Sequence, residues 1–197
     1  TWKRKVEKAI DDFDLLNFDV YHFESGMDFF KDSSFAQNVK KLGRKIVCHY
    51  HGEDLRTRGV MPELDAVSDL NLTSEVDLLE KHPNITYLFL PFDTDSFTPK
   101  HKLNNPIRVC HAPTNRYYKG SATIIAICQK LESEGTIMFD LIENLPHQEA
   151  LNRKLEADIF IDQIGDKGGW GYGMNSVESL SMGICTLSML NETYQNF

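Results

Sequence analysis

Short apolar runs alternate with segments of helical periodicity along most of this chain. The apolar runs include FDVYHF, RKIVCHY, IRVCHA, TIMFDLI, DIFIDQI and ICTLSML. Between them apolar residues recur at helical spacing, as Val6, Ile10 and Phe13 do in WKRKVEKAIDDF. Short strands separated by helices are typical of right-handed βαβ units and parallel sheets. The sequence therefore predicts an α/β fold with parallel sheets.

A polar stretch near the middle interrupts this alternation. FDTDSFTPKHKLNNP follows Pro91 and has neither a helical nor a strand period. We therefore predict a first domain over residues 1–94, a linker over 95–106 and a second domain over 107–197, each domain Rossmann-like. Within the first domain, SEVDLLEKHP predicts a helix between the strand-like runs AVSDLNLTS and ITYLFLP.

Composition limits the environment and the partners of the chain. Of its 197 residues 41% are hydrophobic and 25% charged, a balance typical of globular proteins. The net charge of -8 argues against nucleic acid as a partner, because phosphate binding requires a basic surface. The four cysteines form no C-x-x-C pair, which favours reduced thiols and a cytoplasmic location. No apolar run is long enough to span a membrane, and the first residues do not resemble a signal peptide.

The stretch GDKGGWGYGMNSVES, residues 165–179, joins a predicted strand to a predicted helix and is rich in glycine. Glycine lets a backbone approach a ligand closely, and the N-terminus of the following helix attracts anions. Glu178 would lie near the first turn of that helix, where it could accept hydrogen bonds from sugar hydroxyls. An ordinary surface loop with Glu178 as a helix-dipole carboxylate is the alternative.

Two further segments follow predicted strands. HAPTNRYYKG, residues 111–120, places Arg116 and Lys119 where a diphosphate could bind, although a solvated basic turn would have the same sequence. HYHGEDLR, residues 49–56, carries His49 and His51 on one side of an extended stretch. With Asp54 they could form a metal site of hydrolase type; the alternatives are a capping Asp54 and a packed histidine. The sequence offers no second His/Asp cluster that would complete such a coordination set.

The order of these segments resembles the GT-B glycosyltransferases, in particular the family 4 type. The resemblance rests on motifs in the expected order: His51-Gly52-Glu53-Asp54-Leu55-Arg56, then Pro113 to Lys119-Gly120, Asp162-Gln163, Tyr172-Gly173-Met174-Asn175-Ser176-Val177-Glu178 and Met182-Gly183. FDVYHFESG is similar to a strand and loop of the family's first domain. The resemblance implies a GT-B fold of two Rossmann-like domains.

It also implies an activity, the transfer of a sugar from a nucleotide-diphosphate sugar to a hydroxyl, usually with retention at the anomeric carbon. No metal or other cofactor is expected. The acceptor would be a glycan, a lipid-linked molecule or a small molecule, and contact with a membrane surface is compatible with the family.

The resemblance assigns roles to individual residues. The catalytic group would comprise His51, beside the transferred sugar or the acceptor, with Lys119 and Arg116 on the donor diphosphate. The donor would be bound by Glu178 on the ribose and by Gly173, Met174, Asn175, Asp162 and Gln163 around it. The remaining substrate contacts would come from Asp54, Arg56, Trp170 and Tyr172.

The sequence departs from the family pattern in two respects. Many relatives have a second glutamate eight positions before the ribose-binding one, where this chain has Trp170. The chain is also expected to lack segments at both ends, so that each domain would be incomplete. Two other functions therefore stay open: a non-catalytic relative that binds a nucleotide or glycan, and a metal-dependent hydrolase that uses His49, His51 and Asp54.

Overall fold

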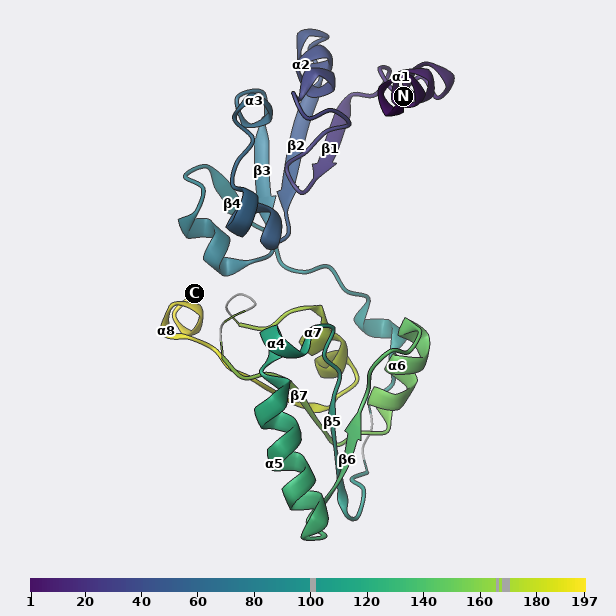
Figure 1. Cartoon of the computed structure of the whole chain (residues 1–197), viewed down its shortest axis with the longest axis vertical. Coiled ribbons are helices and arrows are strands. Elements are labelled where there is room, and N and C mark those ends of the chain that lie inside the picture. Colours follow the sequence, from purple (N-terminus) through teal and green to yellow (C-terminus); the bar gives the residue numbers. More distant parts are fainter. Residues whose placement is uncertain (100–101, 166, 168–170) are drawn as a thin grey trace. The chain divides into compact units, whose positions relative to one another are not determined.

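The computed structural model describes residues 1–99, 102–165, 167 and 171–197. Contacts divide the chain into two compact units, Thr1–Phe89 and Leu90–Phe197. Each unit contains one sheet, and the figure shows helices beside each of them (Figure 1). None of the helices in the described part of the chain combines the length and hydrophobicity that a membrane span requires.

The first unit contains a four-stranded parallel sheet in the order β1-β2-β3-β4. Its elements are α1 (Trp2–Asp12), β1 (Val20–Glu24), α2 (Ser34–Lys41), β2 (Lys45–Tyr50), η1 (Asp54–Arg58), α3 (Pro62–Asp65), β3 (Leu70–Thr73), η2 (Val76–Glu80) and β4 (Ile85–Tyr87). The helix expected over SEVDLLEKHP is reduced to η2, a short 3-10 segment, so that prediction of a full helix was wrong. Pro83 and a turn follow closely and leave no room for further helical turns.

The core of the first unit lies on one face of its sheet. Alternation along β1 and β2 places Tyr21, Phe23 and Cys48 on that face, packed with α2. The alternate residues of the same strands, His22, Glu24 and His49, lie on the opposite face and are at least partly exposed. Polar side chains therefore stand together on that second face.

The second unit contains another four-stranded parallel sheet, in the order β6-β5-β7-β8. Its elements are η3 (Thr94–Ser96), β5 (Ile107–His111), α4 (Arg116–Lys119), α5 (Ser121–Ser133), β6 (Ile137–Leu141), α6 (His147–Leu155), β7 (Ile159–Gln163), α7 (Met174–Ser181), β8 (Cys185–Ser188) and α8 (Glu192–Gln195).

Helices cover both faces of this second sheet, as a doubly wound fold requires. Ile124 and Cys128 of α5 pack on one face with Val109. On the other face Phe160 packs with residues of α6 and of the segment that leads from α7 into β8. Because the sheet is fixed from both sides, the loops at its carboxyl edge start from rigid positions.

Candidate functional site

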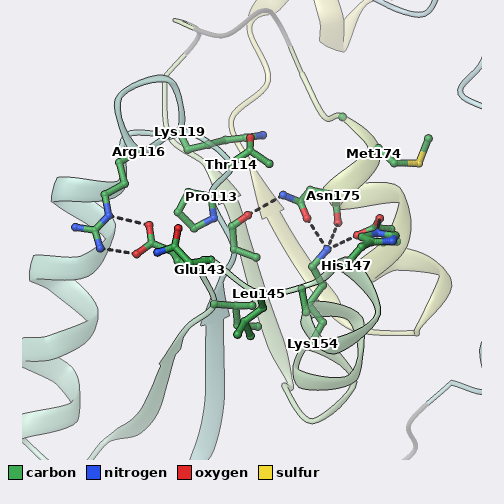
Figure 2. Close-up of a pocket in the computed structure, with 16 residues that line it drawn as sticks. Pro113, Thr114, Arg116, Lys119, Glu143, Leu145, His147, Lys154, Met174 and Asn175 are labelled. Atoms are coloured by element: carbon green, nitrogen blue, oxygen red, sulfur yellow. Dashed lines mark hydrogen bonds and ion pairs between the residues drawn. The ribbon is translucent and has the colours of Figure 1, made fainter.

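A cavity of about 900 Å³ lies within the second unit (Figure 2). Its walls come from the loops that follow β5 and β6, from helix α6 and from the start of α7. The carboxyl edge of a doubly wound parallel sheet is where such folds bind ligands. Arg116, Lys119, Gly173, Met174, Asn175 and Glu178, all expected on the donor, line this one cavity.

Glu178 forms the buried end of the cavity. Its carboxylate accepts a hydrogen bond from Lys154 Nζ at one oxygen and contacts His147 Nε2 at 2.8 Å with the other (Figure 2). The side chains of Lys154 and Glu178 are only 2% and 7% exposed, so each charge depends on the other. Lys154 also donates to Asn175 Oδ1, which ties α6 to the start of α7.

His147, Lys154 and Glu143 belong to this site although the sequence analysis did not select them. A signal for two of them was present in the helical stretch HQEALNRKLEA. His147, Leu151 and Lys154 recur at helical spacing there, so the two polar residues share the face of a buried leucine. A lysine on an apolar helix face indicates a buried partner.

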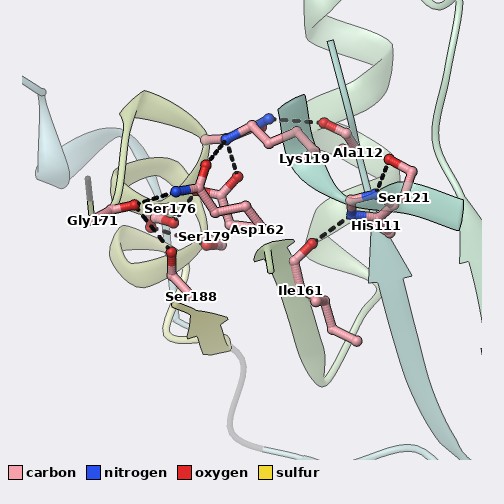
Figure 3. Close-up of polar contacts among 12 residues, drawn as sticks. His111, Ala112, Lys119, Ser121, Ile161, Asp162, Gly171, Ser176, Ser179 and Ser188 are labelled. Carbon is pink, nitrogen blue, oxygen red and sulfur yellow. Dashed lines mark hydrogen bonds and ion pairs between the residues drawn. The ribbon is translucent and has the colours of Figure 1, made fainter. Parts of the chain in front are cut away.

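Lys119 lies at the end of α4 and is held by the last two residues of β7 (Figure 3). Its Nζ donates to Asp162 Oδ1 at 2.6 Å and to Gln163 Oε1 at 3.1 Å. The second oxygen of Asp162 accepts from Ser176 Oγ at 2.6 Å, so Asp162 links Lys119 to helix α7. Asp162 and Gln163, expected on the donor, thus hold Lys119; neither lines the cavity.

Arg116 lies on the exposed side of the cavity. Its guanidinium pairs with both carboxylate oxygens of Glu143, the Nε contact measuring 2.7 Å (Figure 2). This pair lowers the pKa of Glu143, chiefly through the hydrogen bond from Arg116. Both cations expected at the diphosphate are therefore present at the cavity, and each is paired with a carboxylate of the protein.

Two turns position these cations. Asn115 caps the short helix α4 by accepting from the amides of Tyr117 and Tyr118, which fixes the direction of Arg116 and Lys119. Gly120 then adopts a φ of +68°, and a Cβ there would lie 2.5 Å from Ile164 Cγ1. Only glycine fits this junction without displacing its neighbour.

His111 connects elements of the second unit from which the site is built. It is fully buried; Nδ1 donates to the carbonyl oxygen of Ile161 at 2.7 Å, and Nε2 lies 2.7 Å from Ser121 Oγ (Figure 3). Burial lowers the pKa of His111. The imidazole joins β5, β7 and the first turn of α5 as a neutral group.

In the first unit, the carboxylate of Asp54 is bound by the backbone of its own turn. Its carboxylate accepts from the backbone amides of His51, Gly52 and Leu55 at 2.8–3.2 Å. Burial tends to raise the pKa of Asp54, but these amide hydrogen bonds outweigh it and the pKa is lowered. Asp54 is the first residue of η1, whose N-cap is Glu53, so these contacts hold the turn before the helix and are not a helix cap.

Arg56 is also engaged within the first unit. Its guanidinium donates to both oxygens of Asp77 at 2.6 Å and to Glu75 at 2.8 Å. These contacts hold η1 against η2. Of the other residues expected on the substrate, Tyr172 packs its ring against Tyr194, with centroids 5.6 Å apart, and Trp170 lies outside the described residues.

The structure corrects the metal set considered from the sequence. Within the described residues, the group close enough to hold a metal ion comprises His22, Glu24 and His49, and Asp54 is not part of it. His51 lies beside this group, with its Nε2 on Glu24 Oε2. A second His/carboxylate pair therefore exists, contrary to the sequence-based expectation. It was missed because His22 and Glu24 stand on a different strand.

No protein-family model and no curated protein matches the sequence. Among solved structures, an α-glucosyltransferase in complex with UDP and a 13-mer DNA containing a central A:G mismatch is similar. The TM-score is 0.61 and the identity 12%, over 89% of this chain and 61% of that one. A protein assigned as a UDP-N-acetylglucosamine 2-epimerase from Listeria monocytogenes also matches, with TM-score 0.46, 12% identity and coverages of 93% and 58%.

The likeness to the glucosyltransferase structure bears on the fold. The chain has an α/β fold with two four-stranded parallel sheets that matches GT-B type structures. The fold class expected from the sequence is confirmed. The chain spans about 61% of the length of the glucosyltransferase.

Proposed function

We propose that this chain provides the donor-binding part of a glycosyltransferase that moves a sugar from a nucleotide-diphosphate sugar to a hydroxyl acceptor, with retention. The observation that carries the proposal is the cavity of the second unit. It brings a buried carboxylate, two cations and a helix N-terminus together at the carboxyl edge of a sheet in a GT-B type fold. In a nucleotide-diphosphate sugar, the ribose hydroxyls would bind the carboxylate, and the diphosphate would bind the cations and the helix N-terminus.

At the buried end, Glu178 would accept hydrogen bonds from the ribose hydroxyls. Lys154 and His147 fix the orientation of its carboxylate, because each of its oxygens has one protein partner. A carboxylate oxygen can accept more than one hydrogen bond, so capacity for the sugar remains. Asn175, tied to Lys154, would hold the neighbouring part of the nucleotide.

At the other end, Arg116, Lys119 and the start of α7 would bind the diphosphate. The amides near Gly173 and Met174 belong to the first turn of α7, where N–H groups lack helical partners. When the glycosidic bond to the donor breaks, negative charge accumulates on the leaving diphosphate. Preoriented cations and amides would stabilise that charge in the transition state, with no metal required at the donor.

The acceptor side is assigned to the first unit by the resemblance alone. His51 would act beside the transferred sugar or the acceptor, with Asp54 shaping its turn through the amide of His51. Arg56, Tyr172 and Trp170 stay proposed substrate contacts. A glycan, lipid-linked or small-molecule acceptor fits the net charge of -8 better than DNA does, because like charges repel.

A non-catalytic nucleotide-binding relative is the second candidate, and one observation favours it. Arg116 and Lys119 already pair with Glu143 and Asp162, so a diphosphate would compete with these carboxylates. Such a protein would bind the donor without transferring its sugar.

The first experiment is a thermal-shift titration of the chain with UDP, GDP, ADP and their sugar conjugates. A ligand that binds the folded state alone raises Tm with concentration. We expect one base to be preferred and its affinity to fall about tenfold or more in Lys119→Ala and in Glu178→Gln, the effect of a lost charge-assisted bond. Lys130→Ala, which changes an exposed lysine of α5, is the matched control. Unchanged affinity in both site variants would contradict the assignment.

Transfer is then measured with the preferred donor and a panel of hydroxyl acceptors. His51→Ala should keep nucleotide affinity and lose transfer. Binding without transfer to any acceptor would support the second candidate over the first.

A further inference from the structure

Strands β1 and β2, with the residue that follows β2, bring three histidines and one glutamate together on the partly exposed face of the first sheet. The two strands are neighbours in the sheet (Figure 1). They pair in parallel, with Glu24 opposite His49 in the register. His22 lies two residues before Glu24 and so shares its face, and His51 lies two residues after His49. Pairing of two strands, rather than local sequence, creates this cluster.

The distances fit a common ligand. One ligand atom each from His22, Glu24 and His49 lies within 4.8 Å of the other two. His22 Nε2 is 3.6 Å from Glu24 Oε1, beyond the range of a good hydrogen bond. The rings of His22 and His49 stack with centroids 5.8 Å apart, and those of His49 and His51 lie 4.3 Å apart.

His49 provides an independent observation. Its Nε2 is buried and has no hydrogen-bond partner among the described residues. A buried polar atom without a partner costs free energy that the fold otherwise avoids, and such an atom calls for an explanation. Coordination of a metal ion would satisfy it. The side chains of His22 and Glu24 are 48% and 60% exposed, so an ion could reach the cluster from solvent.

The structure also argues against a simpler reading, a set of surface ion pairs. Only one contact in the cluster is a close hydrogen bond, that between Glu24 and His51. It uses Oε2 and leaves Oε1 directed toward His22. Ion pairing with Glu24 therefore accounts for His51 and, at 3.6 Å, for His22, but it leaves the buried Nε2 of His49 without a partner among the described residues.

We propose that His22, Glu24 and His49 bind one divalent transition-metal ion of the Zn²⁺ type. Two imidazoles and one carboxylate form a ligand set that Zn²⁺ accepts, with a further position open to water. Nitrogen-rich ligands select Zn²⁺ and its neighbours over Mg²⁺ and Ca²⁺, which prefer oxygen. His51 serves as the outer partner that orients the carboxylate of Glu24.

This site lies wholly in the first unit, so the inference does not depend on the nucleotide site of the second. It also differs from the set His49, His51 and Asp54, because Asp54 is turned to backbone amides. The site would join the carboxyl ends of β1 and β2 through an ion that the donor chemistry does not use.

The test is calorimetric titration of the untagged, metal-stripped chain with ZnSO₄. Every protein carries Cys185→Ser, because an exposed thiol binds Zn²⁺ itself. We expect one Zn²⁺ per chain, with the affinity reduced at least about tenfold in Glu24→Gln and in His49→Gln. His147→Gln is the matched control, since His147 also contacts a glutamate but lies in the second unit. Mg²⁺ should not compete.

Two outcomes would overturn the proposal: no stoichiometric binding by the parent chain, or an equal loss of affinity in His147→Gln. Circular dichroism shows whether each variant is folded, and Glu24→Gln changes a side chain exposed enough to leave the core intact. Co²⁺ gives a second readout that folding alone would not produce. Its visible absorption should appear in the parent and vanish in both site variants; an unchanged spectrum in them would contradict the ligand assignment.

Discussion

The carboxyl edges of the two sheets carry opposite kinds of polar chemistry. In the second unit, Lys154 with Glu178 and Lys119 with Asp162 form ion pairs that are largely buried. In the first unit, His22 and Glu24 stand about half exposed and share no close hydrogen bond. The folds are alike, and Arg56 with Asp77 forms a largely buried pair in the first unit too, but the part of that edge that carries His22 and Glu24 is open to solvent.

The difference follows from burial. A buried charge is stable only when a partner compensates its lost hydration, so the second edge must hold its cations and carboxylates in fixed pairs. A half-exposed imidazole needs no such partner. An anionic ligand at the second edge would therefore have to compete with Glu143 and Asp162 for the two cations, whereas the buried Nε2 of His49 in the first unit has no partner among the described residues to give up.

The largest effect should come from Lys154→Met, which leaves Glu178 buried without its lysine. We expect a loss of about 3 kcal/mol in unfolding free energy, measured by urea denaturation. Glu24→Gln in the first unit should cost less than about 1 kcal/mol, because that side chain is mostly exposed. Adding Glu178→Gln to Lys154→Met should restore most of the loss. Equal losses of unfolding free energy in Lys154→Met and Glu24→Gln would contradict the contrast between the two edges.

A second variant tests how tightly the second edge is packed. Gly120→Ala would place a Cβ 2.6 Å from the carbonyl oxygen of Ile164 at a φ of +68°. Gly135→Ala is the control, since its φ of +73° is similar but nothing lies within 4 Å. We expect Gly135→Ala to cost about 1 kcal/mol and Gly120→Ala about 2 kcal/mol. The same Tm for both variants would show that Ile164 moves aside from a Cβ at residue 120 at little cost in free energy.

Acid should weaken the second unit through His111. Burial lowers the pKa of this group in the folded state, so the unfolded chain takes up the proton more readily. Its stabilising contribution is therefore present above the ordinary histidine pKa of about 6.5 and is lost as the pH falls below it. Urea unfolding from about pH 7.5 to about pH 5.5 should show a smaller slope in His111→Gln than in His147→Gln, which serves as control. Identical slopes would exclude His111 as the cause.

The smallest effect concerns the exposed pair of the second edge. Glu143→Gln removes the carboxylate that competes for Arg116. We expect the affinity for the preferred nucleotide diphosphate to rise about two- to fivefold, the range of an exposed ion pair. Weaker binding would instead mean that Glu143 holds Arg116 in its productive position.

The fold was largely predictable because its signals are local. Val6 and Ile10 stand at helical spacing, and both are buried in α1. The run DIFIDQI contains β7, and Asp162 and Gln163 end it as expected. The segment SEVDLLEKHP misled the prediction because its apolar residues pack as a short 3-10 turn rather than a helix.

The sequence by itself determined the order of strands and helices and the position of Arg116, Lys119 and Glu178 beside strand ends, since these depend on residues close together in the chain. The tertiary structure decided which charges are compensated. Lys154 meets Glu178 and His22 meets His49 only through the pairing of elements far apart in sequence. Burial of one pair and exposure of the other then follow from which sheet face is covered, and no local pattern contains that information.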